Sequence, residues 1–143
     1  MKKVAIIGAG ISGLFIANLF KKNSNYQITI YEKSTSVNLE EGYGIQLSVN
    51  SIKLLNEIKF NEFQNDEKFT PHKINFYSNS SSNKICELNI SDFNSDNCKY
   101  TTLKRSVLIS FLMRDLKDKI KTGYSIAKIN QLDQKIKLSF ENN

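Results

Sequence analysis

A hexapeptide with three spaced glycines, GAGISG at residues 8–13, constrains the fold of this chain more than any other stretch. The run before it, VAII at 4–7, is uncharged and mostly β-branched, which is typical of a strand buried on both faces of a parallel sheet. The run after it, from Ser12 to Lys22, is mostly apolar and predicts a helix. Glycines at this spacing allow a tight turn, close approach of the backbone to a bound group, and close packing of the helix on the strand. The sequence therefore predicts a strand, a loop and a helix, in that order.

The segment that follows gives this loop its context. Residues 27–32, QITIYE, read as a second strand that ends in Glu32. A carboxylate about twenty residues beyond such a loop is placed to accept hydrogen bonds from a ribose hydroxyl, while the pyrophosphate of the same ligand lies at the helix N-terminus. A carboxylate there repels a 2′-phosphate, so NADP is disfavoured at this site. The strand, loop, helix, strand and acid together predict a dinucleotide-binding unit.

The same stretch is compatible with two other interpretations. Two lysines followed by an uncharged run over 4–20 are also typical of an export signal or a membrane anchor. A membrane helix has no use for this glycine spacing, and no small-x-small cleavage motif follows the run, so we favour the phosphate loop and expect no integral membrane association. A glycine turn in an ordinary strand-helix-strand unit, with Glu32 merely solvated, is the remaining alternative.

Length and composition limit the classes of function. A chain of 143 residues, 40% hydrophobic and 24% charged, is long enough for one domain with a real core. The net charge of +6 comes from lysines scattered among acids rather than from a basic stripe, which argues against nucleic-acid binding. Cys86 and Cys98 lack the spacing of metal ligands, and His72 is the single histidine in the sequence, so no metal site is predicted. Without an export signal, reduced thiols in the cytoplasm are expected.

The rest of the chain predicts further elements. A polar connection over 34–47 ends in GYGIQL, and Ser48 or Asn50 can cap a short helix that runs to about Ile58. Strands are predicted at 73–77, 84–88, 125–129 and 135–140, and a long helix is predicted over 105–121. Lys104 and Arg105 put cations at the positive end of that helix, which is unfavourable unless an anion lies nearby. The spacing alone does not decide whether these two cations extend into solvent or lie beside an anion.

Four segments in order, GAGISGL, YEK, GYGIQLSVNSIKLL and LKRSVLISFL, resemble the N-terminal half of the single-component (class A) FAD-dependent aromatic monooxygenases, which include salicylate and 4-hydroxybenzoate hydroxylases. The resemblance spans almost the whole chain and is weakest between residues 59 and 100. It implies an α/β, Rossmann-like FAD-binding fold over 1–143, with a parallel sheet and a partial β excursion at 60–100 that belongs to a substrate domain. The family's later glycine-aspartate motif and most of its substrate-binding sheet have no counterpart here, so we expect a truncated chain that is inactive alone.

The resemblance also implies a cofactor, co-substrates and the residues that bind them. FAD is the implied cofactor, NAD(P)H its transient reductant, and O2 and a small aromatic compound the substrates. Gly44, Ile45 and Gln46 are expected beside the flavin ring, Arg105 in contact with the cofactor, and Ile126 near the adenine. The residues expected to hold the ADP half of FAD are Gly8, Gly10, Ile11, Ser12, Gly13, Glu32 and Lys33. The motifs identify no catalytic acid or base.

Two other hypotheses remain open at this stage. The first is an NAD-binding Rossmann oxidoreductase that uses Glu32 on the nicotinamide dinucleotide; it leaves the GYGIQL segment and Arg105 without a purpose. The second is a non-catalytic nucleotide-binding module that a partner chain completes.

Overall fold

The computed structural model describes residues 1–37 and 43–141, and the chain divides into two compact units. The first comprises Met1–Glu41 and Leu108–Asn143, and the second comprises Gly42–Val107. The first unit contains β1 (Lys2–Ile7), α1 (Ile11–Lys21), β2 (Tyr26–Glu32), the 3-10 turn η3 (Lys117–Lys119), β7 (Ile120–Thr122), β8 (Ile126–Leu132) and β9 (Lys135–Phe140). The second contains β3 (Gly44–Leu47), α2 (Val49–Asn56), η1 (Phe60–Glu62), β4 (Lys73–Tyr77), β5 (Lys84–Asn89), η2 (Ile90–Phe93) and β6 (Thr101–Lys104). Helix α3 (Arg105–Met113) contains the boundary between the units.

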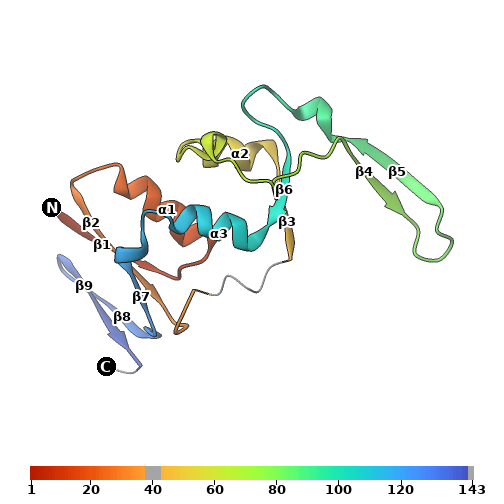
Figure 1. The fold of residues 1–143 in the computed structure, drawn as a ribbon. Helices are drawn as coiled ribbons and strands as arrows, with labels where there is room; N and C mark the ends of the chain where they lie inside the picture. The colour runs from red at the N-terminus through yellow and green to blue at the C-terminus, as the bar shows by residue number, and fades with distance from the viewer. Residues whose placement is uncertain (38–42, 142–143) are drawn as a thin grey trace. The chain divides into compact units, whose positions relative to one another are not determined.

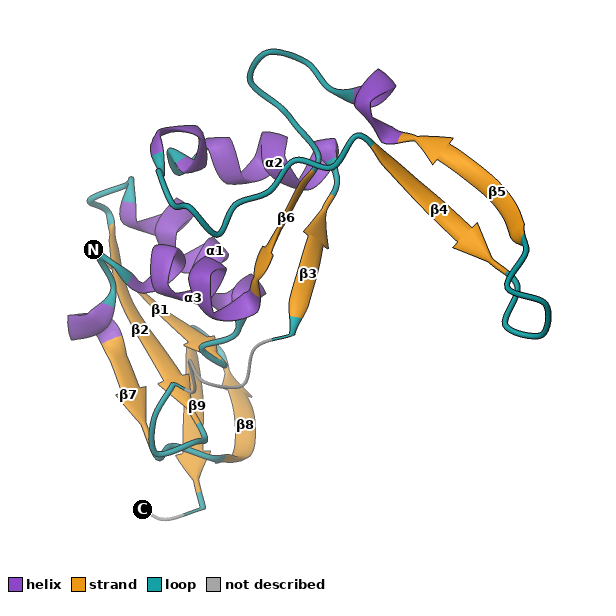
Figure 2. Cartoon of the chain, turned by 45° about the vertical axis from the view of Figure 1, so that its right-hand side comes forward, coloured by secondary structure: helices purple, strands orange, loops and turns teal. Residues whose placement is uncertain are grey.

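A parallel sheet forms the centre of the first unit. Its strand order is β1-β2-β7, with Val4 opposite Ile28 and Glu32 opposite Thr122 (Figures 1 and 2). Read from β7 to β1, this is the 3-2-1 half of the usual Rossmann strand order. Helix α1 packs on β1 and β2, and its Ala17 is fully buried. The predicted α/β fold with a parallel sheet is confirmed, and the first twenty residues form a strand, a turn and a helix.

An aromatic cluster lies on one face of this sheet. Successive residues of a strand point to opposite faces, so Tyr31 lies on the face opposite that of the buried Ile30. The ring of Tyr31 contacts the rings of Tyr124 and Phe140 at centroid distances of 5.5 and 4.8 Å, and these two rings lie 5.1 Å apart. The antiparallel hairpin of β8 and β9 thus packs against the sheet through one strand-end ring and one ring from the preceding turn.

Two separate antiparallel pairs make up the strands of the second unit. β3 pairs with β6, and β4 pairs with β5 in the hairpin that Figure 2 shows. The sequence predicts the hairpin strands at these positions. It does not predict the pairing of β3 with β6, because residues 44–47 follow a polar segment and carry no signal of a strand partner. Helix α2 begins after Ser48, as expected. The apolar residues buried in this unit are Ile52, Leu55, Ile58, Phe60, Ile90, Leu103 and Val107.

The long helix predicted over 105–121 is wrong beyond its first half. α3 ends at Met113, a 3-10 turn follows, and β7 begins at Ile120. Leu116 and Ile120 continue the helical spacing of apolar residues, but Leu116 is buried in a turn and Ile120 pairs with Ile30 in the sheet. Apolar residues at helical spacing do not distinguish a continuing helix from a turn followed by a strand when no glycine or proline marks the end of the helix.

The middle of the predicted polar connection, including Gly42 of GYGIQL, lies outside the described residues. Within the described residues, none of the helices combines the length and the apolar character needed to cross a lipid bilayer.

Candidate functional site

The turn between β1 and α1 has the geometry of a phosphate loop. Gly8 takes a φ of +97°, a conformation that favours glycine, and its N–H donates to the carbonyl of Tyr31 at 2.8 Å. Gly10 is the N-cap of α1, and its carbonyl accepts the first helical hydrogen bond, from Leu14 at 2.9 Å. The chain thus leaves the carboxyl end of β1 and enters the helix within three residues.

Gly13 and Gly10 meet their surroundings in opposite ways. A Cβ atom on Gly13 would lie 2.1 Å from the carbonyl oxygen of Gly8 and 3.3 Å from a side-chain carbon of Ile6, so the helix approaches the strand too closely for any other residue. A Cβ atom on Gly10 would meet no described atom within 4 Å and would project into open space. Gly13 therefore serves the packing of α1 on β1, whereas Gly10 leaves open space at the start of α1.

The N-terminus of α1 is suited to an anion. Its first N–H groups have no partner inside the helix, and the helix dipole adds partial positive charge there. Among the described residues, no side chain caps this end and no acid lies in the first turn. The N–H groups of Ile11, Ser12 and Gly13 therefore belong to an end of the helix that suits a phosphate or pyrophosphate group.

Glu32, at the carboxyl end of β2, lies beside the loop. Its Oε2 accepts a hydrogen bond from the Ala9 N–H at 2.8 Å, and its Oε1 accepts one from the Ser34 N–H at 3.0 Å. Partial burial raises the pKa of this carboxyl, but the hydrogen bonds from Ser34 and Ala9, with the nearby charge of Lys33, outweigh it and hold the pKa below the ordinary value of 4.5. Glu32 is therefore a carboxylate at neutral pH.

The turn after β7 closes the site on the side of Glu32. The N–H of Tyr124 donates to the backbone carbonyl of Glu32, and the N–H of Gly123 donates to that of Ser34, both at 2.8 Å. Gly123 has a φ of +77°, so glycine suits this turn. The predicted adenine neighbour, Ile126, is half-buried and begins β8 just beyond the turn.

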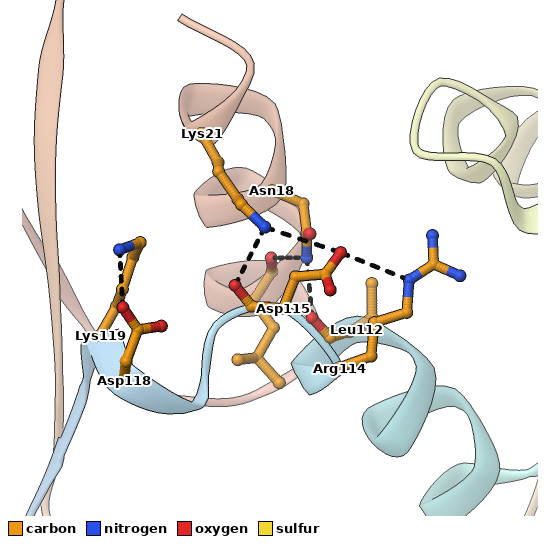
Figure 3. Close-up of polar contacts among 8 residues, drawn as sticks. Asn18, Lys21, Leu112, Arg114, Asp115, Asp118 and Lys119 are labelled. Carbon is orange, nitrogen blue, oxygen red and sulfur yellow. Dashed lines mark hydrogen bonds and ion pairs between the residues drawn. The ribbon is translucent and has the colours of Figure 1, made fainter. Parts of the chain in front are cut away.

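Contacts at the opposite end of α1 fix the helix in place (Figure 3). The Asn18 Nδ2 donates to the carbonyls of Leu14 and Leu112 at 2.9 and 2.8 Å, which ties α1 to the end of α3. The Lys21 Nζ donates to the Asp115 carbonyl at 3.1 Å and lies 3.6 Å from its carboxylate. The lysine and aspartate side chains are 40% and 55% exposed, so their ion pair contributes little, and the Asn18 bridge is the stronger constraint on α1.

The flavin-side candidates lie in the second unit. Gly44, Ile45 and Gln46 form most of β3, whose register pairs Gly44 with Lys104. The Gln46 Oε1 accepts a hydrogen bond from the Tyr100 hydroxyl at 2.9 Å. Arg105 is half-buried at the first position of α3.

The expected anion near that helix start is not supplied within the described part of the chain. Lys104 pairs with Glu67, but none of the described carboxylates forms an ion pair with Arg105. A cation at the positive end of a helix favours a negatively charged ligand nearby, so Arg105 remains a candidate for cofactor binding.

The first unit thus brings together the glycine loop, Ile11, Ser12, Glu32 and the turn before Ile126, while Lys33 is exposed next to Glu32. Gly44, Ile45, Gln46 and Arg105 belong to the second unit. The sequence does not predict the backbone donors of Ala9, Ser34 and Tyr124, because every residue except proline carries a backbone N–H group. Gly123 is the signal in the sequence for the turn after β7.

Comparison with known proteins agrees with this geometry. Residues 6–38 match the model of an NAD(P)-binding Rossmann-like domain, and this range covers the end of β1, the loop, α1 and β2. No curated protein matches the sequence.

Solved structures match over nearly the whole chain. 2,6-Dihydroxypyridine-3-hydroxylase from Arthrobacter nicotinovorans is 15% identical with a TM-score of 0.75, and the match covers 98% of this chain and 33% of that protein. Klebsiella pneumoniae HpxO, complexed with FAD and uric acid, is 18% identical with a TM-score of 0.76, over 98% of this chain and 35% of HpxO. The chain has a Rossmann-like fold. It spans about a third of the length of these proteins.

This Rossmann-like fold does not by itself decide the chemistry. A Diels-Alderase of pyrroindomycin biosynthesis is 13% identical with a TM-score of 0.77, over 99% of this chain and 30% of that enzyme. One fold therefore occurs in a hydroxylase and in a Diels-Alderase, so the activity has to be argued from the site.

Proposed function

We propose that the chain binds FAD, and that its first unit holds the ADP half of the cofactor. The open space at Gly10, beside the positive end of α1 and next to an ionised Glu32, carries this proposal. The residues present fit a dinucleotide: the free backbone N–H groups at the start of α1 would hold the pyrophosphate, and the Glu32 carboxylate would accept from a ribose diol. Gly8, Gly10, Ile11, Ser12, Gly13, Glu32 and Lys33 are the proposed contacts, with Ile126 near the adenine.

In the second unit, Gly44, Ile45 and Gln46 are proposed to lie beside the flavin ring and Arg105 to contact the cofactor. The hydrogen bond from Tyr100 to the Gln46 Oε1 supports this assignment, because it leaves the amide N–H groups of Gln46 available to a ligand acceptor. The place of Arg105 at the first position of α3, where the helix dipole is positive, supports an anionic ligand there.

For the whole protein we propose an NAD(P)H-dependent flavoprotein monooxygenase that hydroxylates a small aromatic compound with O2. The resemblance of the four motifs and the likeness to a hydroxylase with a hydroxypyridine substrate in its name support this assignment. Bound FAD would supply the redox chemistry, while the protein positions it and excludes water. Residues 60–100 are proposed as part of the substrate domain within a chain that otherwise binds FAD. A cytoplasmic location fits the free thiols of Cys86 and Cys98.

One specific observation favours a second candidate, an NAD-binding Rossmann oxidoreductase. The family model matched by residues 6–38 describes NAD(P) binding, and the geometry around Glu32 suits the adenosine ribose of NAD equally well. A module completed by a partner chain is a third possibility, and it predicts that flavin is retained only when that partner is present.

Titration of the purified chain with FAD, followed by flavin fluorescence, separates these proposals. We expect FAD to bind, ADP to compete with it, and FMN, which lacks the ADP half, to compete poorly. NAD that displaces FAD at equal or lower concentration would favour the second candidate, and absence of FAD binding by the folded chain would contradict the leading proposal.

Gly10→Ala is the variant that connects this titration to the structure. The added methyl group enters open space in the ligand-free chain but occupies the proposed pyrophosphate position. We therefore expect FAD affinity to fall at least tenfold while the thermal unfolding midpoint stays close to that of the wild type. Unchanged affinity in this variant would remove Gly10 from the proposed site.

A further inference from the structure

The Glu32 carboxylate holds two backbone segments together in the ligand-free chain. One oxygen accepts from Ala9, which lies inside the glycine loop and 23 residues earlier in the chain, and the other accepts from Ser34 just after β2. The backbone carbonyl of Glu32 also accepts from Tyr124. The loop, the end of β2 and the turn after β7 therefore meet at one residue.

We propose that Glu32 is a positioning residue for the phosphate loop: its carboxylate fixes the loop over 8–13 in the conformation that presents the N-terminus of α1 to a pyrophosphate. This inference rests on the proposed function. The resemblance implies that Glu32 contacts the ribose. The inference adds a second role, in which Glu32 supports the binding of a pyrophosphate that its carboxylate does not touch.

The composition and burial of the loop make the Ala9 hydrogen bond important for its shape. Gly8 and Gly10 flank Ala9, and glycine loses more conformational entropy on ordering than any other residue. Ala9 is only 3% exposed, so its N–H would be costly to bury without an acceptor. Glu32 supplies that acceptor, and as a charged one it makes a stronger bond than a carbonyl would.

The two roles of the carboxylate are compatible. An ionised carboxylate offers about four lone-pair positions, and the bonds from Ala9 and Ser34 use one on each oxygen. The remaining positions can accept the hydroxyls of a ribose. Loss of FAD binding in a Glu32 variant would consequently not distinguish the roles, and the test needs a ligand without a ribose.

Inorganic pyrophosphate is that ligand, and Glu32→Ala is the variant. Alanine removes both acceptor oxygens, so the Ala9 N–H loses its partner. If Glu32 braces the loop, pyrophosphate affinity falls in E32A. If Glu32 acts on the ribose alone, affinity stays the same or rises, because a negative charge near the anion has been removed. Asp133→Asn, in the turn between β8 and β9, removes the same charge away from the loop and is the control.

Hydrogen exchange in the ligand-free chain gives a second measurement that involves no cofactor. We expect the Ala9 amide to exchange at least about tenfold faster in E32A, the factor typical of a lost hydrogen bond to a charged group. The amide of Ala17, inside α1, should keep its rate, and D133N should leave both rates unchanged. If E32A does not fold, Glu32→Asp, which keeps the charge but shortens the side chain, should show the same faster exchange at Ala9.

The outcomes separate this inference from the proposed function. Faster exchange at Ala9 with weaker pyrophosphate binding supports the positioning role. An Ala9 rate in E32A equal to that of the wild type overturns it, even where FAD binding is lost. A wild-type chain that binds neither FAD nor pyrophosphate defeats the proposed function, while the exchange comparison still decides whether Glu32 fixes the loop.

Discussion

Replacement of Gly13 by alanine should destabilise the chain, although helix propensity alone predicts the reverse. The new Cβ would lie 2.1 Å from the Gly8 carbonyl oxygen, and Cβ contacts below 3.0 Å essentially never occur, so strand and helix must separate locally by roughly 1 Å. The obstructing atom belongs to backbone, which cannot rotate away as a side chain can. Overpacking of this kind lowers the free energy of unfolding by about 3 kcal/mol at the upper end of its range. The higher helix propensity of alanine offsets about 1 kcal/mol, so the expected net loss of stability is about 2 kcal/mol.

Thermal and urea unfolding, followed by far-UV circular dichroism, measure this effect. For a chain of 143 residues, a loss of this size lowers the midpoint by about 5–10 °C. Gly10→Ala is the matched control, because its methyl group meets no described atom within 4 Å and the less favourable N-cap costs under about 1 kcal/mol. If Gly13→Ala is as stable as the wild type, or more stable, the close approach of α1 to β1 is refuted as the reason for this glycine.

Three further changes test other parts of the structure. Asn18→Ala removes the bridge from α1 to the Leu112 carbonyl and should cost about 1–2 kcal/mol in urea unfolding; a loss too small to measure would mean that the bridge contributes nothing. Leu112→Ala empties a fully buried position and should cost about 2–5 kcal/mol, whereas Leu132→Ala, at a position 53% exposed, should cost far less; equal losses would contradict the burial of α3. Because the pKa of Glu32 is lowered in the folded chain, its carboxylate stabilises the fold above the ordinary value of 4.5, and this contribution disappears as the pH falls through the folded-state pKa. The stability difference between wild type and E32Q should therefore be full at neutral pH and shrink in acid, and a difference independent of pH would contradict the hydrogen bonds assigned to the carboxylate.

The N-terminal strand-loop-helix-strand unit was predictable because its signals are local. The apolar run before Gly8, the glycine spacing and the acid at Glu32 each describe a structure that forms within a few residues. The packing role expected of Gly13 is likewise supported by its distance to the Gly8 carbonyl.

Features that depend on distant pairing could not be read in this way. β3 becomes a strand only because 101–104 lie beside it, and nothing within 44–47 signals that partner. The segment 114–122 keeps a helical spacing of apolar residues, yet its last three residues form β7, because they pair with β2 in the parallel sheet. In the site, the side chain of Glu32 was predicted, but its partners were not, because backbone N–H groups carry no sequence signal.

The most direct test of the central claim, that this chain binds a dinucleotide at the N-terminus of α1, is a titration of the isotope-labelled chain with FAD followed by amide NMR shifts. We predict that the largest saturable changes occur at residues 8–13 and at 32–34, where the loop and the carboxylate lie. The absence of saturable shifts, or shifts that leave the amides of 8–13 unchanged, would contradict the claim.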